Sequence, residues 1–157
     1  MAEDSTGNLA EASDGPRISQ ENLCEIVGVT PAMRRRWADR HHLEKRGGDG
    51  YLEYDAVELA ALRALDRCLP STEAQLAWEQ LREMLGENLD LSAPLLAAYD
   101  RQDKKAGLIV TLADLVDFSE YGHPVLVIDF GDPIKRVRSA FARLVKQREN
   151  TGDPGEK

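Results

Sequence analysis

The segment Gly28-Val29-Thr30-Pro31 places the strongest local constraint on the fold. Glycine readily takes the left-handed conformation that ends a helix, and an apolar stretch at helical spacing precedes it. A threonine hydroxyl can accept a hydrogen bond from the free amides of a new helix, and proline suits a first helical position because no amide hydrogen is needed there. The segment therefore predicts one helix over about residues 20–27, a tight turn, and a second helix that begins at Pro31.

Positive charge is concentrated around this second helix, although the chain as a whole is acidic. Residues 31–46 contain six Lys or Arg and two Asp or Glu, a balance of +4, whereas the 157 residues carry a net charge of −8. Guanidinium groups on an exposed helix reach both phosphate oxygens and the N7/O6 edge of guanine. We therefore expect Arg35, Arg36 and Arg40 to contact nucleic acid, and Trp37 to anchor the helix on its neighbours. The alternative is a solvated basic helix that pairs with acidic residues elsewhere.

Two strings in this region resemble a known DNA-binding family. The string G-V-T-P-A-M-R-R-R-W, followed by G-Y-L-E-Y-D-A-V-E-L, is similar to the MerR-type, excisionase-like winged helix-turn-helix over about residues 18–69. The resemblance implies that Thr30 caps the reading helix and that Arg35 touches the DNA backbone. It also implies that Tyr54 belongs to the wing, a glycine-rich hairpin over about residues 43–54.

Two positions differ from the family pattern. Arg34 stands where the family has a buried Leu or Val, so either Met33 takes over that packing or the arginine stem lies along the core with its head in water. Glu53 stands near the position of the family's wing arginine, which Lys45 and Arg46 can partly replace. The complete set of candidate DNA-binding residues is Thr30, Arg34, Arg35, Arg36, Arg40, Lys45, Arg46 and Tyr54.

Beyond the wing, apolar periodicity predicts mainly helices. One helix is expected from a cap at Asp55 to Pro70, and the next from Ser71 or Thr72 to Gly86. The C-terminal elements are expected to be a helix over 94–102, a buried strand over 108–112, a helix to Phe118 capped through Thr111 and Asp114, a strand over 125–130, and a last helix capped by Asp132.

The predicted fold class is mainly α with a small β component. A winged helix-turn-helix with backing helices is expected over 18–88, and a β-α-β-α module for dimerisation or signal reception over 89–148. Residues 1–17 are predicted to be a disordered acidic tail, and residues 149–157 a second disordered tail, because both lack apolar periodicity.

No sequence pattern supports catalysis, a cofactor or a structural metal. The chain contains no GxGxxG, GxxxxGK[ST], CxxC or HExxH motif. Asp114, Asp117, Asp129 and Asp132 could converge on a hard cation such as Mg²⁺, as a small enzyme on the C-terminal unit would require. Helix capping already explains Asp114 and Asp132, so we expect no metal site and no enzyme activity.

We expect a MerR-like, sequence-specific DNA-binding protein, and a transcriptional regulator in particular. It should bind double-stranded DNA as a homodimer, with residues 89–148 available to a protein partner. The basic last helix, with +6 over residues 133–148, can touch DNA, pair with acidic residues or contact a partner. The alternatives are a protein-interaction adaptor on a winged fold that does not bind DNA, and an excisionase-like DNA-architectural factor.

The sequence also predicts the compartment. The chain has no run of about 18 apolar residues and no basic, then apolar, N-terminal start. We therefore expect a cytoplasmic protein without a membrane span.

Overall fold

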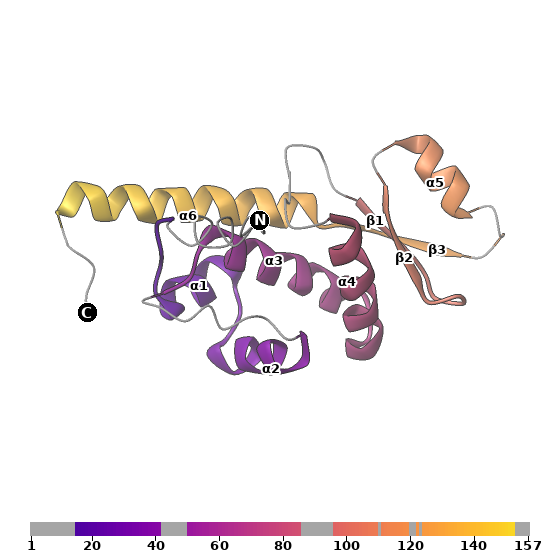
Figure 1. The fold of residues 1–157 in the computed structure, drawn as a ribbon, viewed down its shortest axis with the longest axis horizontal. Coiled ribbons are helices and arrows are strands. Elements are labelled where there is room, and N and C mark those ends of the chain that lie inside the picture. The colour runs from indigo at the N-terminus through magenta and orange to yellow at the C-terminus, as the bar shows by residue number, and fades with distance from the viewer. Residues whose placement is uncertain are drawn as a thin grey trace, which may run out of the picture.

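The computed structural model describes residues 15–41, 50–85, 96–109, 111–119, 122 and 124–152. Its helices are α1 (Gln20–Val27), α2 (Pro31–His41), α3 (Glu53–Cys68), α4 (Ser71–Leu85), α5 (Leu112–Ser119) and α6 (Gly131–Thr151), and its strands are β1 (Leu96–Asp100), β2 (Lys105–Ile109) and β3 (Val125–Asp129). The helices α1 to α4 and the long α6 form the main body, and the strands and α5 lie at one end (Figure 1). The predicted class, mainly α with a small β component, is confirmed. None of the described helices is long and apolar enough to cross a membrane.

The start of the chain folds as its capping residues predict. Ser19 caps α1, since its hydroxyl accepts the Asn22 amide at 3.2 Å, and Gly28 ends that helix in the left-handed conformation, with φ 73°. The Thr30 hydroxyl accepts the Met33 amide at 3.2 Å, so Thr30 caps α2 as expected. Local residue chemistry is enough to fix both ends of this turn.

The segment before α1 is tied to the segment before α3. Ile18 and Tyr51 form an antiparallel bridge with two main-chain hydrogen bonds of 2.9 and 2.8 Å. Arg17, which the sequence placed in the tail, donates to the Gly50 carbonyl at 3.1 Å, and Arg148 of α6 donates to the Arg17 carbonyl at 2.6 Å. The described chain is therefore held in place from Arg17 onward.

The start of α3 corrects the predicted wing. Asp55 was expected to cap this helix, but α3 begins at Glu53, and the Asp55 carboxylate accepts the Leu52 amide at 2.9 Å from inside the first turn. Tyr54 consequently lies in that first helical turn and not in a hairpin strand. The predicted hairpin itself falls largely on residues 42–49, which lie outside the described residues.

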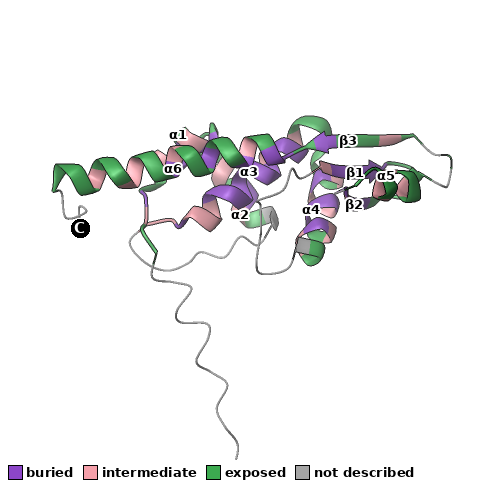
Figure 2. Ribbon diagram, turned by 90° about the horizontal axis from the view of Figure 1, so that it is seen from above, coloured by how far each residue is buried: buried purple, intermediate pink, exposed green. Residues whose placement is uncertain are grey.

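The helix α3 is the centre of the hydrophobic core. It packs against α1, α4 and α6, and its residues from Ala56 to Leu62 are all buried, including Glu58, which lies 3.7 Å from Arg82 of α4. In Figure 2 the buried colour concentrates on α3 and on the side of α6 that faces it. The same core includes Tyr99 of β1, so the predicted parts 18–88 and 89–148 share one core.

The sheet corrects the prediction for residues 94–102. We expected a helix there, but residues 96–100 form β1, the central strand of an antiparallel sheet with order β2-β1-β3. Two flanking strands satisfy the main chain of β1, and Ala97, Ala98 and Tyr99 are fully covered. The C-terminal unit is therefore β-β-α-β-α and not β-α-β-α. The strand predicted over 108–112 lies at 105–109 instead.

Of the two capping predictions for helices in this unit, the one for α5 is confirmed and the one for α6 is wrong. Thr111 and Asp114 cap α5 reciprocally, as predicted, with the Thr111 amide donating to the Asp114 carboxylate at 2.7 Å. Asp132 does not cap α6, because it lies inside the first turn. The carboxylate of Asp129 takes that role and accepts the amides of Gly131 and Asp132 at 3.0 and 3.2 Å. The helix then runs to Thr151, past the residue where a tail was predicted to begin.

Candidate nucleic-acid-binding site

The helix α2 is held in position by its first turn and by one buried aromatic side chain. Trp37 is 4% exposed and belongs to the main core, which confirms its predicted role as an anchor. Because Thr30 caps the helix and Trp37 packs inward, the orientation of α2 about its own axis is fixed. The helices α2 and α6 lie on opposite sides of α3 (Figure 1).

The turn between α1 and α2 is supported by a residue that the sequence reading missed. Arg63 of α3 donates a hydrogen bond to the Val27 carbonyl, and a Cβ at position 28 would collide with its guanidinium group. Burial, and then the nearby Arg67, lower the pKa of Arg63. The left-handed φ therefore favours glycine at position 28, and a Cβ there would also displace the flexible end of Arg63. The helical pattern of α3 gives no signal that one of its arginines reaches this turn.

Arg35 and Arg36 are the two candidate residues that α2 presents to solvent. Both side chains are exposed, and within the described part of the chain neither forms a salt bridge. Two adjacent guanidinium groups on a capped helix offer planar donors that a phosphate or a guanine edge can accept. The prediction for these two residues is compatible with where the structure places them.

Arg34 makes contacts within the chain. Its guanidinium carbon lies 5.3 Å from the centroid of the Tyr51 ring, and its Nη2 donates to the Gln20 side chain at 3.1 Å. Both the Arg34 side chain and Met33 are half-buried, and Met33 packs on the core, as the first alternative holds. The second alternative placed the Arg34 head in water, whereas its guanidinium lies over Tyr51 and its Nε is buried. Arg34 thus braces α2 against α1 and against the segment before α3.

The other predicted DNA-binding residues either lie outside the described structure or have a structural role. Arg40 belongs to α2, but its side chain lies outside what the structure describes, as do Lys45 and Arg46 entirely. Tyr54 is half-buried at the start of α3, and the Thr30 hydroxyl is used in capping. The structure therefore brings together only part of the predicted set, centred on Arg35 and Arg36.

The acid at the wing position is neutralised from the other end of the chain. Arg138 of α6 donates to the Glu53 carboxylate at 2.8 Å, so Glu53 does not present an unpaired negative charge. Arg136 pairs with Asp132 at 2.7 Å within α6. Part of the basic charge of α6 therefore serves internal pairing. Three further basic residues of this helix, Lys135, Arg143 and Lys146, are exposed.

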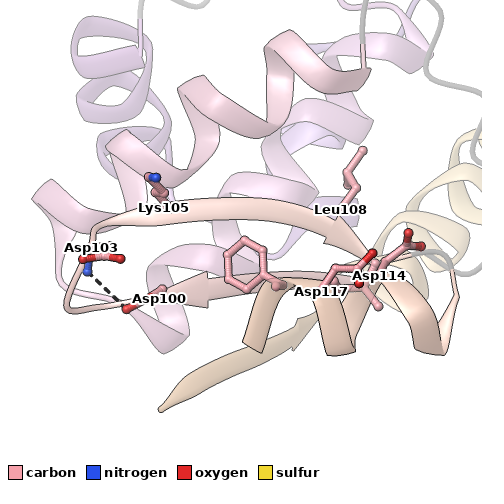
Figure 3. Close-up of a pocket in the computed structure, with 8 residues that line it drawn as sticks. Asp100, Asp103, Lys105, Leu108, Asp114 and Asp117 are labelled. Carbon is pink, nitrogen blue, oxygen red and sulfur yellow. Dashed lines mark hydrogen bonds between the residues drawn. The ribbon is translucent and has the colours of Figure 1, made fainter. Parts of the chain in front are cut away.

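The four aspartates considered for a cation do not converge. Asp114 and Asp117 line an open cavity of about 360 Å³ together with Asp100 and Asp103 of the β1–β2 hairpin (Figure 3). The other two candidates, Asp129 and Asp132, lie at the start of α6 instead. Across the described ranges, no three His, Cys, Asp or Glu side chains form a group that could hold a metal ion.

The chain was also compared with known proteins. No model of a protein family matches it, and no curated protein sequence matches it.

Proposed function

We propose that this protein is a sequence-specific DNA-binding protein of the MerR-like type, and that it acts as a transcriptional regulator. One observation carries the proposal: Arg35 and Arg36 stand exposed on a helix that Thr30 caps and Trp37 anchors. Such a helix, preceded by a short helix and a three-residue turn, has the form that enters the major groove in helix-turn-helix proteins. A non-enzymatic role in the cytoplasm without a cofactor belongs to the same proposal.

The charge distribution supports docking through α2. The chain carries −8 overall, so most of its surface repels DNA phosphates, whereas α2 carries four arginines against one aspartate. The other basic helix, α6, uses part of its charge in ion pairs with Glu53 and Asp132, so we expect the acidic body to approach DNA with α2 in a preferred orientation. Two copies of the chain would present two such helices to the two halves of a palindromic site.

Binding to fragmented genomic DNA of the source organism at two salt concentrations tests the proposal. The full chain should enrich specific fragments, and the variant Arg35→Ala/Arg36→Ala should lose this enrichment. The matched control is Lys135→Ala/Arg143→Ala, which removes the same charge from exposed positions of α6 and should keep the enrichment.

Two outcomes would contradict the proposal. If the full chain does not bind DNA even at low salt, the fold serves protein contacts, as the adaptor alternative holds. If both double variants lose binding equally, net charge and not α2 governs the interaction. Enrichment without sequence preference, together with DNA bending, would favour the architectural alternative.

A further inference from the structure

The two edge strands of the small sheet differ in how their main-chain groups are covered. At the β2 edge, the side chain of Gln80 from α4 accepts the Ala106 amide at 2.6 Å and donates to the Lys104 carbonyl at 3.1 Å. One amide side chain thus satisfies a donor and an acceptor that a neighbouring strand would otherwise use. Gln80 therefore covers the beginning of the β2 edge, where another strand could otherwise pair.

Within the part of the chain that the structure describes, the β3 edge has no comparable cover. Among the described residues, no side chain forms a hydrogen bond to the main chain of β3 between Val125 and Ile128, and these four residues carry no charge. Proteins usually protect an exposed edge strand with lysine, proline, a bulge or a covering element, because the free edge pairs with other strands. In Figure 2, β3 is coloured exposed along most of its length.

One face of the sheet is covered over β2 and β1 but not over β3. Strand register places Gly107, Ala98 and Val127 in one row across this face. Phe118 of α5 lies against Gly107, and Ala98 is fully buried, yet Val127 is 44% exposed. The helix α5 therefore covers β2, and Val127 at the other side of this row is left open.

The opposite face shows the same pattern. Ala106, Tyr99 and Leu126 form a row there, and Tyr99 is fully buried whereas Leu126 is 37% exposed. The central strand is thus covered on both faces, while apolar side chains of β3 are open on both. Pairing with another strand would remove these apolar side chains from water and would satisfy the free main-chain groups of the edge.

The helix α5, which packs on β2, also carries exposed apolar side chains. None of its residues is buried, and Leu112 and Val116 are 76% and 55% exposed. Asp114 and Asp117 line the cavity that α5 forms with the β1–β2 hairpin (Figure 3). Helical spacing puts Leu112 and Val116 on the flank of α5 away from these two acids. An exposed apolar flank of this kind needs a covering surface.

We infer that β3 pairs antiparallel with β3 of a second copy of this chain, so that two three-stranded sheets become one continuous sheet. A twofold axis perpendicular to the sheet places equivalent faces on the same side, so the two Val127 side chains meet on one face and the two Leu126 side chains on the other. Each copy thereby covers the apolar groups that the other leaves open.

The uncharged β3 edge and the pairing of the nearby charges favour a second copy as the occupant. A chain with net charge −8 can associate with itself only where like charges do not meet unpaired. Near the β3 edge, Asp129 is bonded to two amides and Asp132 is paired with Arg136. At the edge itself, Leu126 and Val127 are 37% and 44% exposed, and a second copy would cover both.

This interface would join two α2 helices in one particle, and in that respect it builds on the proposed DNA-binding function. The pairing itself depends on β3 and can be measured without DNA. Light scattering at tens of micromolar should give a dimer for the full chain and a monomer for Val127→Lys. The matched control, Met84→Lys, places the same charge on an exposed apolar position of α4 and should remain a dimer.

A cross-linking experiment tests the surface directly. Cys68 is exposed and is replaced by serine, while Cys24 is buried and can stay. Oxidation should then link two copies through Val127→Cys or Leu126→Cys, and should not link them through Met84→Cys. A monomeric full chain, or a dimer that persists in Val127→Lys and links through neither β3 cysteine, would overturn the inference. The Arg35→Ala/Arg36→Ala variant should remain a dimer, so failure of the DNA proposal is distinguishable from failure of this one.

Discussion

The guanidinium group of Arg34 lies over the ring of Tyr51, with 5.3 Å between the guanidinium carbon and the ring centroid. This contact joins α2 to the segment that bridges to Ile18, and the hydrogen bond from Arg34 to Gln20 joins the same helix to α1. An arginine that stands where the resembled family has a buried Leu or Val is therefore a brace between three segments. Its neighbours Arg35 and Arg36 remain open to a ligand.

Replacing Arg34 should reduce stability, whereas replacing Arg35 should not. Arg34→Ala removes the contact with Tyr51 and the hydrogen bond to Gln20, and we expect the free energy of unfolding to fall by about 1–2 kcal/mol. Arg35→Ala should change it by less than about 0.5 kcal/mol, because this side chain is exposed. Urea unfolding followed by circular dichroism measures both. Equal losses for the two variants would refute the structural role of Arg34.

Replacing Gly28 should destabilise the turn between α1 and α2. Gly28→Ala strains a left-handed backbone and displaces Arg63, so we expect a loss of about 1–3 kcal/mol or more. Gly152→Ala is the matched control, since Gly152 is also left-handed but has no heavy atom within 4 Å of the added Cβ. Its loss should be about 1 kcal/mol. If both variants lose the same stability, the contact with Arg63 contributes nothing.

The stability of the protein should fall at alkaline pH through Tyr99. Burial, and next the neighbouring Glu73, raise the pKa of Tyr99 above its ordinary value of 10.0. The folded state then retains a proton that the unfolded state releases, so this contribution to stability is complete below pH 10 and is lost as the pH rises further.

The variant Tyr99→Phe tests this prediction. It should flatten the decline of unfolding free energy above pH 10. At neutral pH it should change stability by less than about 1 kcal/mol, because within the described structure the buried Tyr99 hydroxyl has no hydrogen-bond partner. An unchanged alkaline decline in Tyr99→Phe would assign it to other groups.

The salt dependence of DNA binding should report on Arg35 and Arg36. If each neutralises one phosphate, the slope of log affinity against log salt should become shallower by about 2 in Arg35→Ala/Arg36→Ala. Fluorescence anisotropy with an enriched duplex measures this slope. In contrast, Arg34→Ala should leave the slope nearly unchanged, since its guanidinium is engaged with Tyr51 and Gln20. A shallower slope in Arg34→Ala alone would reverse these assignments.

Where a single residue decides a local conformation, the residue type alone was sufficient to predict that conformation. Gly28 ends α1, Thr30 caps α2, and Thr111 with Asp114 caps α5, because each of these bonds joins groups within a few residues along the chain. The anchor role of Trp37 also followed from its size. The sequence thus determined the turn between the first two helices, the exposed position of a basic helix, and the fold class.

Tertiary structure decided what depends on partners distant in sequence. Residues 96–100 contain two alanines and an aspartate, which have little strand preference of their own, but hydrogen bonding to β2 and β3 makes them the central strand. The distinction between Arg34 and Arg35, the pairing of Glu53 with Arg138, and the support of Gly28 by Arg63 likewise require groups brought together by folding. Local bonds can be inferred from residue order, whereas these contacts exist only once the core places α3, α6 and the sheet together.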